Sequence, residues 1–155
     1  MDGPVVKVLS SAADIHAAVG QELGHSDWLT IDQHRIDQFA SATDDHQWIH
    51  VDPERAEDGP FGTTIAHGYL TLALLPHLVG QIYTIDGARM RVNYGLNKVR
   101  FPSPVKVGAR VRARSELIEA TDVEGGVQVV VRSTIEVEGG ERPACVAEHV
   151  GRVYF

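Results

Sequence analysis

The stretch from Gly68 to Ile82 constrains the fold more than any other part of the chain, because it is apolar on nearly every side. A helix without a polar face must be buried on most sides. Pro76 lies within the stretch and either bends such a helix or removes one of its hydrogen bonds. The stretch is also too short for a membrane span, which takes about 18 apolar residues. It therefore predicts a buried central helix and no membrane segment.

After about residue 88 the hydrophobic pattern changes to a period of two. Four runs alternate apolar and polar side chains, over residues 90–101, 107–118, 127–137 and 143–154. Glycines and charges at 121–126 and 138–142 separate the later runs, as in hairpin turns. Alternation predicts an antiparallel sheet with one buried face. With the apolar helix, it predicts an α+β fold in which the sheet curls around that helix.

Three shorter helices are expected before the apolar stretch, each beginning at a residue that can cap a helix N-terminus. The first covers residues 12–19. The second contains apolar side chains at helical spacing, and the third starts with proline at its first position and ends at Gly59. Their capping residues are Ser10 or Ser11, Thr30 or Asp32, and Asp52.

The chain of 155 residues has no repeat and no linker, so we expect one domain over residues 1–155. Its net charge of −7 argues against a nucleic-acid-binding protein. Met1–Pro4 lacks the basic and apolar regions of a signal peptide. Cys145 is the only cysteine, which fits a reducing cytoplasm, and it lies in a strand-like run as a small buried residue. We expect a cytoplasmic protein with no internal disulfide.

Residues 43–52 contain more ionisable side chains than any neighbouring stretch. Asp45 and His50 are five residues apart, so a turn between them can bring both side chains to one cavity wall. A carboxylate and an imidazole can move a proton on and off one water molecule. The alternative is a polar turn in which Asp44 or Asp52 caps a helix, and the segment alone does not decide between the two.

A metal site is the third interpretation of these side chains. Zinc could in principle be ligated by histidines and aspartates near this stretch, namely Asp44, Asp45, His46, His50 and the distant His67. Their spacing matches no known zinc cage, and the chain offers only one thiol. We therefore expect neither a metal nor a redox cofactor.

The apolar helix begins at His67-Gly68, after the small residues 62–65. A helix N-terminus presents unpaired N–H groups, and Gly68 would let a thioester oxygen approach them without a Cβ in the way. Two structural alternatives stay open. Gly68 could serve close packing of the helix on the sheet, and His67 could be a histidine that makes only structural hydrogen bonds.

These residues carry a resemblance to a known family. Asp45-x-x-x-x-His50 followed by Ile65-Ala66-His67-Gly68 resembles the MaoC-like dehydratases and (R)-specific enoyl-CoA hydratases of the hotdog superfamily. The likeness continues at residues 20–30, at 93–102 and at 104–108. Residues 45–56 are most similar to a compact mycobacterial (R)-3-hydroxyacyl-thioester dehydratase subgroup that includes NodN-like proteins.

The resemblance implies a hotdog fold, with an antiparallel sheet wrapped around the central helix, and a homodimer with active sites near the subunit interface. It implies a lyase of fatty-acid metabolism that hydrates trans-2-enoyl thioesters of CoA or acyl-carrier protein to (R)-3-hydroxyacyl thioesters. Asp45 and His50 would activate the water, and the N–H of Gly68 would support the thioester oxygen. A hotdog thioesterase and a non-catalytic acyl-thioester binder are the alternatives.

Four further side chains are expected to bind substrate, besides His67. Gln47 and Trp48 stand where the family usually has asparagine and proline, and the bulky Trp48 leaves the acyl-chain preference open. Lys98 and Arg100 are, with Lys106, the densest basic group in an acidic chain. They share strand parity and hence one face. They either meet the phosphates of the carrier or belong to a solvated outer face of the sheet.

Overall fold

The structure, a computed structural model, describes residues 5–155. Met1–Pro4, on which the expectation of no signal peptide rests, lie outside the described residues. The helices are α1 (Ala12–Ala17), α2 (Gln33–Thr43), α3 (Trp48–Val51), α4 (Pro53–Glu57), α5 (Gly68–Ala73) and α6 (Leu75–Val79). The strands are β1 (Lys7–Leu9), β2 (Glu22–His25), β3 (Leu29–Thr30), β4 (Tyr83–Ile85), β5 (Met90–Arg100), β6 (Arg110–Val123), β7 (Gly126–Val137) and β8 (Cys145–Tyr154).

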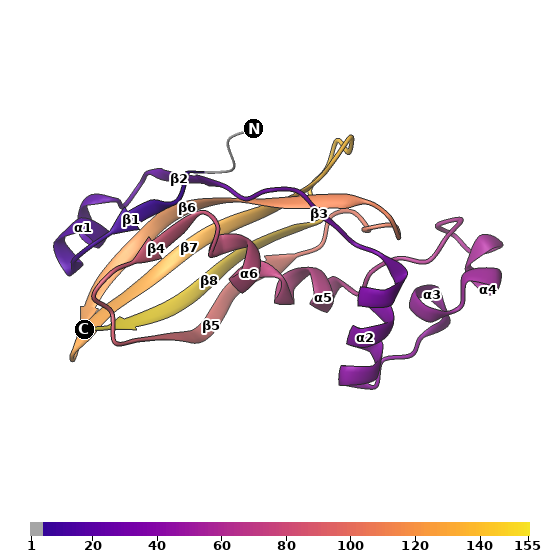
Figure 1. Cartoon of the computed structure of the whole chain (residues 1–155), viewed down its shortest axis with the longest axis horizontal. Helices are drawn as coiled ribbons and strands as arrows, with labels where there is room; N and C mark the ends of the chain where they lie inside the picture. Colours follow the sequence, from indigo (N-terminus) through magenta and orange to yellow (C-terminus); the bar gives the residue numbers. More distant parts are fainter. Residues whose placement is uncertain (1–4) are drawn as a thin grey trace.

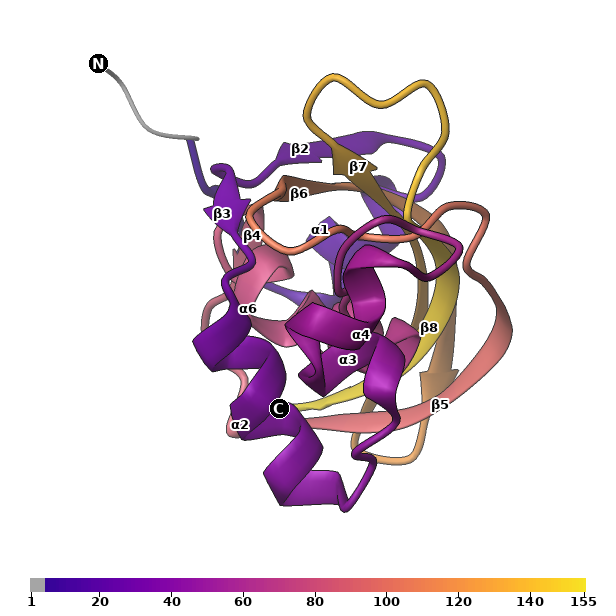
Figure 2. The same cartoon turned by 90° about the vertical axis from the view of Figure 1, so that its right-hand side faces the viewer.

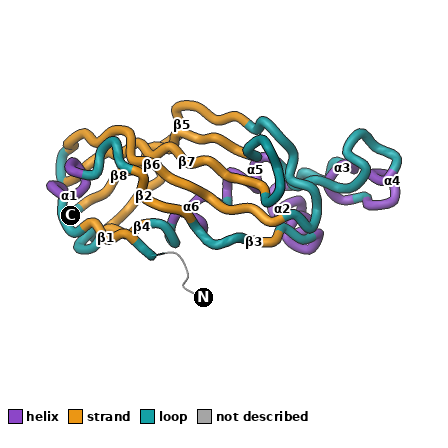
Figure 3. The backbone as a smooth tube through the Cα atoms, turned by 90° about the horizontal axis from the view of Figure 1, so that it is seen from above, coloured by secondary structure: helices purple, strands orange, loops and turns teal. Residues whose placement is uncertain are grey.

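The main sheet is antiparallel and has the order β2-β6-β7-β8-β5, with β3 also paired to β6. It curves around α5 and α6, which lie along its concave face (Figures 1 and 2). The small pair of β1 and β4 is parallel and lies near one end of the sheet, and α2, α3 and α4 gather beyond the other end (Figure 3). The predicted α+β architecture, a sheet wrapped around a central helix, is confirmed.

The inner face of the sheet packs on the two helices to form the core. Alternate residues of β6 and β7 are buried, including Val111, Val131 and Ile135, and they meet Leu78 and Ile82 from the helical side. The outer face carries charged side chains instead. Four arginines of β6 and β7 pair there with glutamates, through Arg110–Glu138, Arg112–Glu136, Arg114–Glu136 and Arg132–Glu148. The alternation expected from the sequence therefore separates core from solvent on these strands.

The central helix differs from the prediction in two ways. It is divided at Leu74 into α5 and α6, because Pro76 in the first turn of α6 has no N–H to donate. It is also not buried on all sides, since one stripe is solvent-exposed in the single chain, made of Tyr69, Ala73, Pro76, His77 and Gly80. A helix with apolar residues on an exposed stripe has surface left over for another partner.

Strand β5 departs most from the expectation of one buried face. Its residues are exposed along nearly the whole length, and only Val99 is half-buried. The strand lies at the edge of the sheet, and its pairing with β8 shifts register twice, near Tyr94 and near Asn97. Each shift exchanges the side-chain faces of the residues that follow. Sequence alternation alone could not reveal either the edge position or the shifts.

The expected turns and caps are largely confirmed. Ser11, Asp32 and Asp52 accept hydrogen bonds from backbone N–H groups in the first turns of α1, α2 and α4. Strand β6 begins later than predicted and continues to Val123, so the turn after it is tighter than expected. The short elements β1 to β4 and α3 were not predicted, because two to four residues are too few for a periodic pattern.

Candidate active site

The ionisable segment at 43–52 lies between α2 and α4. Asp44 ends α2 in the left-handed conformation, with φ of 59°, and this turn redirects the chain toward Asp45. The chain then forms the single turn of α3, which carries His50 into the protein. His50 is buried, whereas Asp45 is exposed. A local turn therefore brings a solvent-accessible carboxylate and a buried imidazole to one side of α2.

The imidazole of His50 is oriented by one backbone hydrogen bond. Its Nδ1 lies 2.7 Å from the carbonyl oxygen of Ile65, and a carbonyl can only accept, so Nδ1 carries the proton. The N–H of Ile65 donates in turn to the carbonyl of Ile49 at 3.0 Å. These two bonds tie α3 to the segment before α5. The Nε2 of His50 is thereby left as the unprotonated nitrogen.

His67 packs directly on His50. The two rings stack with centroids 3.9 Å apart and an interplanar angle of 24°. Nε2 of His67 lies 3.0 Å from the carbonyl oxygen of Asp45, so Nε2 donates and Nδ1 keeps its lone pair. That Nδ1 is buried and has no hydrogen-bond partner among residues 5–155. A buried acceptor without a partner is unusual in a folded protein and marks a place for a bound water or ligand.

Burial lowers the pKa of His50, and the neighbouring His67 lowers it further. The hydrogen bond to Ile65 and the charge of Asp45 act in the opposite direction, but the net shift is downward from 6.5. His50 is therefore neutral at physiological pH. A neutral imidazole with a free nitrogen is the form that can accept a proton.

Gly68 is the first residue of α5, and its N–H has no acceptor within the helix. A Cβ at this position would lie 3.1 Å from the ring of Phe101, at the end of β5. The absence of a side chain therefore allows close packing of the helix on this ring, as one of the two interpretations of the sequence expected. The other interpretation, that the N–H of Gly68 receives a thioester oxygen, stays a prediction that this packing does not contradict.

Asp45, His50 and His67 together form the ionisable cluster of the site. Their carboxylate and ring-nitrogen atoms lie within 4.8 Å of one another, a separation that three metal ligands could have. Lone pairs of imidazole nitrogens lie in the ring plane, however, and these two planes are nearly parallel instead of converging on one point. The arrangement suits a shared water or substrate oxygen better than an ion. That the site needs no metal stays a prediction.

Gln33 and Thr64 support the site and were missed by the sequence analysis. The Gln33 amide donates to the carbonyl of His50 at 2.7 Å and to Asp37 at 2.9 Å. The fully buried Thr64 hydroxyl donates to the Gln33 carbonyl oxygen at 2.6 Å. This chain of hydrogen bonds joins α2, α3 and the segment before α5. Only the tertiary structure brings it together, although a polar Thr64 directly before the apolar Ile65-Ala66 was a weak signal.

Gln47 and Trp48 were also predicted to bind substrate, and both lie within the ionisable segment at 43–52. Gln47 is exposed beside Asp45, and its backbone N–H lies 3.4 Å from the Asp45 carboxylate. Trp48 is half-buried and packs between Arg55, at 4.4 Å, and Gly59. Its ring is thus held by the α4 region, where a larger residue at position 59 would collide with it.

Lys98 and Arg100 do share one face, as strand parity predicted. They pair with Glu148 and Val146 of β8, so they lie on the outer, charged face of the sheet, opposite α5 and α6. Phe101 follows them directly and contacts Gly68, which places the end of β5 beside the start of α5. A role in carrier binding stays a prediction. Cys145 is fully buried, and burial raises the pKa of its thiol to about 11, which makes it a poor nucleophile.

The geometry can be compared with known proteins. The profile of the family described as "MaoC like domain" matches residues 14–139. This chain belongs to the MaoC-like family. The match includes Asp45, His50 and Gly68, so the family assignment made from these motifs is confirmed.

Two relatives and one solved structure place the chain more closely within this MaoC-like family. It is 59% identical over 148 residues to "3-hydroxyacyl-thioester dehydratase Z" of Mycobacterium tuberculosis, covering 95% of this chain and 98% of that one. It is 48% identical to "Nodulation protein N" of Rhizobium leguminosarum, covering 94% and 92%. The (R)-hydratase of A. caviae involved in PHA biosynthesis superposes with a TM-score of 0.70 at 25% identity, covering 86% and 94%. The hotdog fold and the NodN-like subgroup are thereby confirmed.

Among residues 5–155, none of the helices of this MaoC-like chain combines the length and the hydropathy required to cross a bilayer.

Proposed function

We propose that this chain catalyses the reversible hydration of trans-2-enoyl thioesters to (R)-3-hydroxyacyl thioesters. The observation that carries the proposal is the buried, neutral His50 with an unprotonated Nε2, which has one ring nitrogen within 4.8 Å of a carboxylate oxygen of Asp45 and stacks on His67, the residue directly before Gly68. The similarity to a protein named 3-hydroxyacyl-thioester dehydratase supports the same reaction.

The two side chains would act on one water molecule. Nε2 of His50 takes a proton from the water while its oxygen bonds to C3 of the enoyl group, and the Asp45 carboxylate accepts the other O–H as a hydrogen bond. The electron pair of the C2–C3 double bond moves toward the thioester carbonyl, which becomes an enolate. The enolate then collapses and C2 takes up the proton that His50 received, so the net change is addition of one water.

Two further groups would assist the reaction, one at the enolate stage and one while the water is bound. The N–H of Gly68 donates to the developing oxyanion, where a prealigned donor is worth more than in water. The unpartnered Nδ1 of His67 accepts a hydrogen bond from the bound water or substrate and so helps to hold it beside His50. Because one shared water and one base deliver both hydroxyl and proton from the same side, addition is syn.

The CoA or acyl-carrier-protein part of the substrate would lie outside the buried cluster. Lys98 and Arg100 at the end of β5 are candidates to meet its phosphates, because β5 ends beside Gly68. Exposed Gln47, next to Asp45, would contact the substrate at the entrance, and Trp48 would line the entrance from the α4 side. Fatty-acid metabolism in the cytoplasm is the setting that this substrate class implies.

We also infer that the protein works as a homodimer formed through β5. This edge strand exposes four apolar side chains, with exposed fractions of 46% for Met90, 39% for Val92, 58% for Tyr94 and 49% for Leu96. An exposed apolar edge strand is a template for pairing with another strand. Tyr69, 71% exposed, lies next to Gly68 and extends this surface to the active site. A second copy would therefore cover the site entrance.

The deciding experiment is an assay with crotonyl-CoA that follows three products. Loss of the enoyl absorbance without release of free CoA is expected, and the product should be (R)-3-hydroxybutyryl-CoA by chiral chromatography. Release of free CoA would instead establish the thioesterase. Binding without either change would leave a non-catalytic acyl-thioester binder. Rapid NADH formation with a coupled (S)-specific dehydrogenase would overturn the stereochemical assignment.

A further inference from the structure

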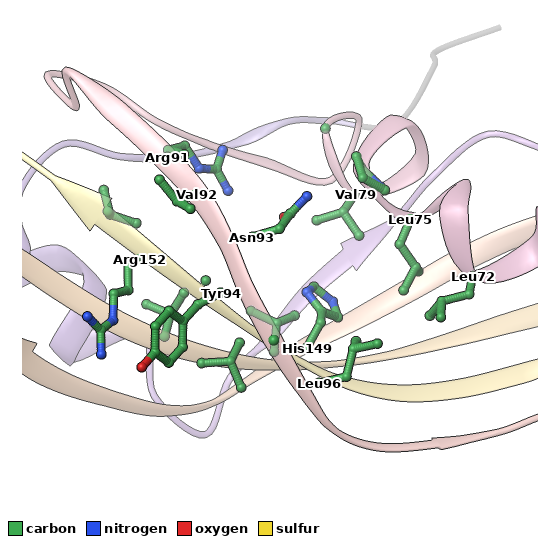
Figure 4. A pocket seen from close by; sticks show the side chains of 18 of the residues that line it. Leu72, Leu75, Val79, Arg91, Val92, Asn93, Tyr94, Leu96, His149 and Arg152 are labelled. Atoms are coloured by element: carbon green, nitrogen blue, oxygen red, sulfur yellow. The ribbon is translucent and has the colours of Figure 1, made fainter. Parts of the chain in front are cut away.

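A cavity of about 580 Å³ lies away from the Asp45–His50 cluster, between α5–α6 and the strands β5 and β8 (Figure 4). This volume is in the range of small-molecule sites. One wall is apolar and comes from the helices, with Leu72, Leu75 and Val79. The opposite wall comes from β5, β7 and β8 and carries Leu96, Val131 and Val153. A hydrocarbon chain fits such walls.

Polar side chains interrupt this apolar lining. Arg91 and Asn93 of β5 and His149 of β8 extend into the cavity (Figure 4). Arg91 donates one hydrogen bond, to the hydroxyl of Tyr83 at 3.2 Å, and makes no ion pair with a carboxylate of residues 5–155. The amide of Asn93 makes no hydrogen bond within the same residues. The cavity therefore contains a cation most of whose donors are not used by residues 5–155, and an amide that makes no hydrogen bond with them.

The ring of His149 is held by hydrogen bonds to the sheet. Its Nε2 lies 2.8 Å from the Ser133 hydroxyl, which lies 2.7 Å from the Ser115 hydroxyl, and both serines are buried in the sheet. Burial, together with the charge of Arg91, lowers the pKa of His149 to about 4, so its ring is neutral at physiological pH. The Nδ1 of this oriented, neutral ring is left for a ligand. The positive charge of the cavity lining therefore comes from two arginines, Arg91 and Arg152. Arg152 donates to the Gln128 side chain and stacks on the Tyr94 ring, so Arg91 is the arginine with more donors left for a ligand.

The elements that line the cavity lead back to the candidate active site. Leu72 lies one helical turn beyond Gly68, and Val79 lies about 16 Å beyond it at the helical rise. On the other side, β5 leads from Phe101, which contacts Gly68, back through Leu96 to Arg91. An acyl chain whose thioester lies at Gly68 would pass between these walls and reach Arg91 with its far end.

We propose that this cavity recognises a carboxylate at the far end of the acyl chain, so that ω-carboxyacyl thioesters are preferred substrates. Arg91 would pair with the carboxylate, and Asn93 and His149 would hydrogen-bond to it. The inference rests on the proposed hydration reaction, and names the substrate class that its site accepts. A purely apolar cavity would reject such a chain, because burying an unpaired carboxylate is strongly unfavourable.

The test compares matched pairs of enoyl-CoAs that end in either a methyl or a carboxyl group. Values of kcat/KM are measured for octenoyl, dodecenoyl and hexadecenoyl pairs with the wild type, Arg91→Gln and Arg89→Gln. Arg89 contacts Tyr154 and the carbonyl of Phe155 outside the cavity, which makes it the matched control. We expect the wild type to favour the carboxyl-ended chain at the length that reaches Arg91. Arg91→Gln should lower the carboxyl-to-methyl ratio by about tenfold or more, equivalent to about 1.4 kcal/mol, and Arg89→Gln should not.

An unchanged ratio in Arg91→Gln, or a wild type that prefers the methyl-ended chain at every length, would overturn the proposal. A carboxylate from the second copy of the chain is the competing partner of Arg91. In that case Arg91→Gln would weaken the dimer in sedimentation and leave the substrate ratio unchanged. Calorimetric binding of the saturated dodecanoyl- and dodecanedioyl-CoA pair gives the same comparison without turnover. Because this binding measurement needs no catalysis, it separates failure of the proposed carboxylate site from failure of the proposed hydration reaction.

Discussion

A single chain holds the side chains of the cluster at Asp45, His50 and His67 in place, but it leaves the edge strand β5 uncovered. Around the cluster, backbone carbonyls hold both imidazoles by hydrogen bonds, Gln33 holds the backbone carbonyl of His50, and the buried Nδ1 of His67 has no partner among residues 5–155. Along β5, apolar side chains face solvent and the edge has no neighbouring strand. One chain thus orients the chemical groups, whereas the surface beside them requires a second molecule. Substitutions in the cluster and on β5 test this difference.

The largest effect is expected from removing either member of the proton-transfer pair. Asp45→Asn and His50→Ala should each lower kcat by about two to four orders of magnitude, the usual range for a lost acid–base group. Circular dichroism should show a retained fold. Asp44→Asn is the matched control, since asparagine also tolerates the left-handed conformation found at this position. Near-normal turnover in either variant, with loss of activity in His67→Ala, would show that the roles are wrongly assigned.

The edge strand is tested by a charge placed on it. Tyr94→Glu should weaken the homodimer by about thirtyfold or more, the effect of losing an aromatic anchor worth about 2 kcal/mol. Analytical ultracentrifugation would measure this change. Val19→Glu places the same charge on another exposed apolar residue, on the α1 side of the molecule, and should leave the dimer intact. A monomeric wild type would contradict the inferred dimer, and equal activity of monomeric Tyr94→Glu would show that the site is complete in one chain.

The pH dependence reports the environment of His50. The proposed base must be neutral, and its pKa is lowered from 6.5, so activity should persist below pH 6.5 and decline only as pH falls through the lowered value. Below that value kcat/KM should fall about tenfold for each pH unit. Profiles of kcat/KM for crotonyl-CoA against pH would measure the midpoint. A midpoint above 6.5 would contradict the assignment of buried His50 as the base.

The supporting hydrogen bonds should have a smaller effect. Thr64→Val keeps the shape of the side chain but removes the hydroxyl that donates to Gln33, and should lower the free energy of unfolding by about 1 kcal/mol. Because Gln33 then holds the His50 carbonyl less firmly, we expect kcat to fall while KM changes little. Urea denaturation and steady-state kinetics measure the two effects. Thr63→Val is the matched control, and an equal loss of kcat in it would refute a specific positioning role.

The smallest effect is expected at the exposed basic pair. Lys98→Glu with Arg100→Glu should raise KM for the CoA substrate by a few-fold and change kcat little, because only uniform binding is lost. The effect should shrink as salt is added, since exposed charges are screened. Lys7→Glu, on β1, is the control for net charge. If the KM of the double variant equals that of the wild type at every salt concentration, these residues do not bind the carrier and belong only to the charged outer face.

Local sequence patterns predicted much of the fold and the position of the site. Alternation identified β6, β7 and β8, and Ser11, Asp32 and Asp52 were correctly chosen as caps. The motif that contains Asp45, His50 and Gly68 indicated both the family and the segment that carries the chemistry. These features succeed because each depends on residues close together in the chain, whose spacing fixes which side chains share a face or a turn.

Only the tertiary structure decided features that depend on distant residues. The tautomer of His50 follows from the carbonyl of Ile65, and the stacking with His67 follows from the start of α5. The register shift of β5 near Asn97 puts Leu96 on the cavity side and Lys98 on the outer face, although plain alternation would give both residues one face. Hydrogen bonds and burial across the fold set proton positions and pKa values, and no spacing within one segment contains that information. The sequence by itself therefore determined which groups are present and near one another, and packing determined which of their atoms are free to react.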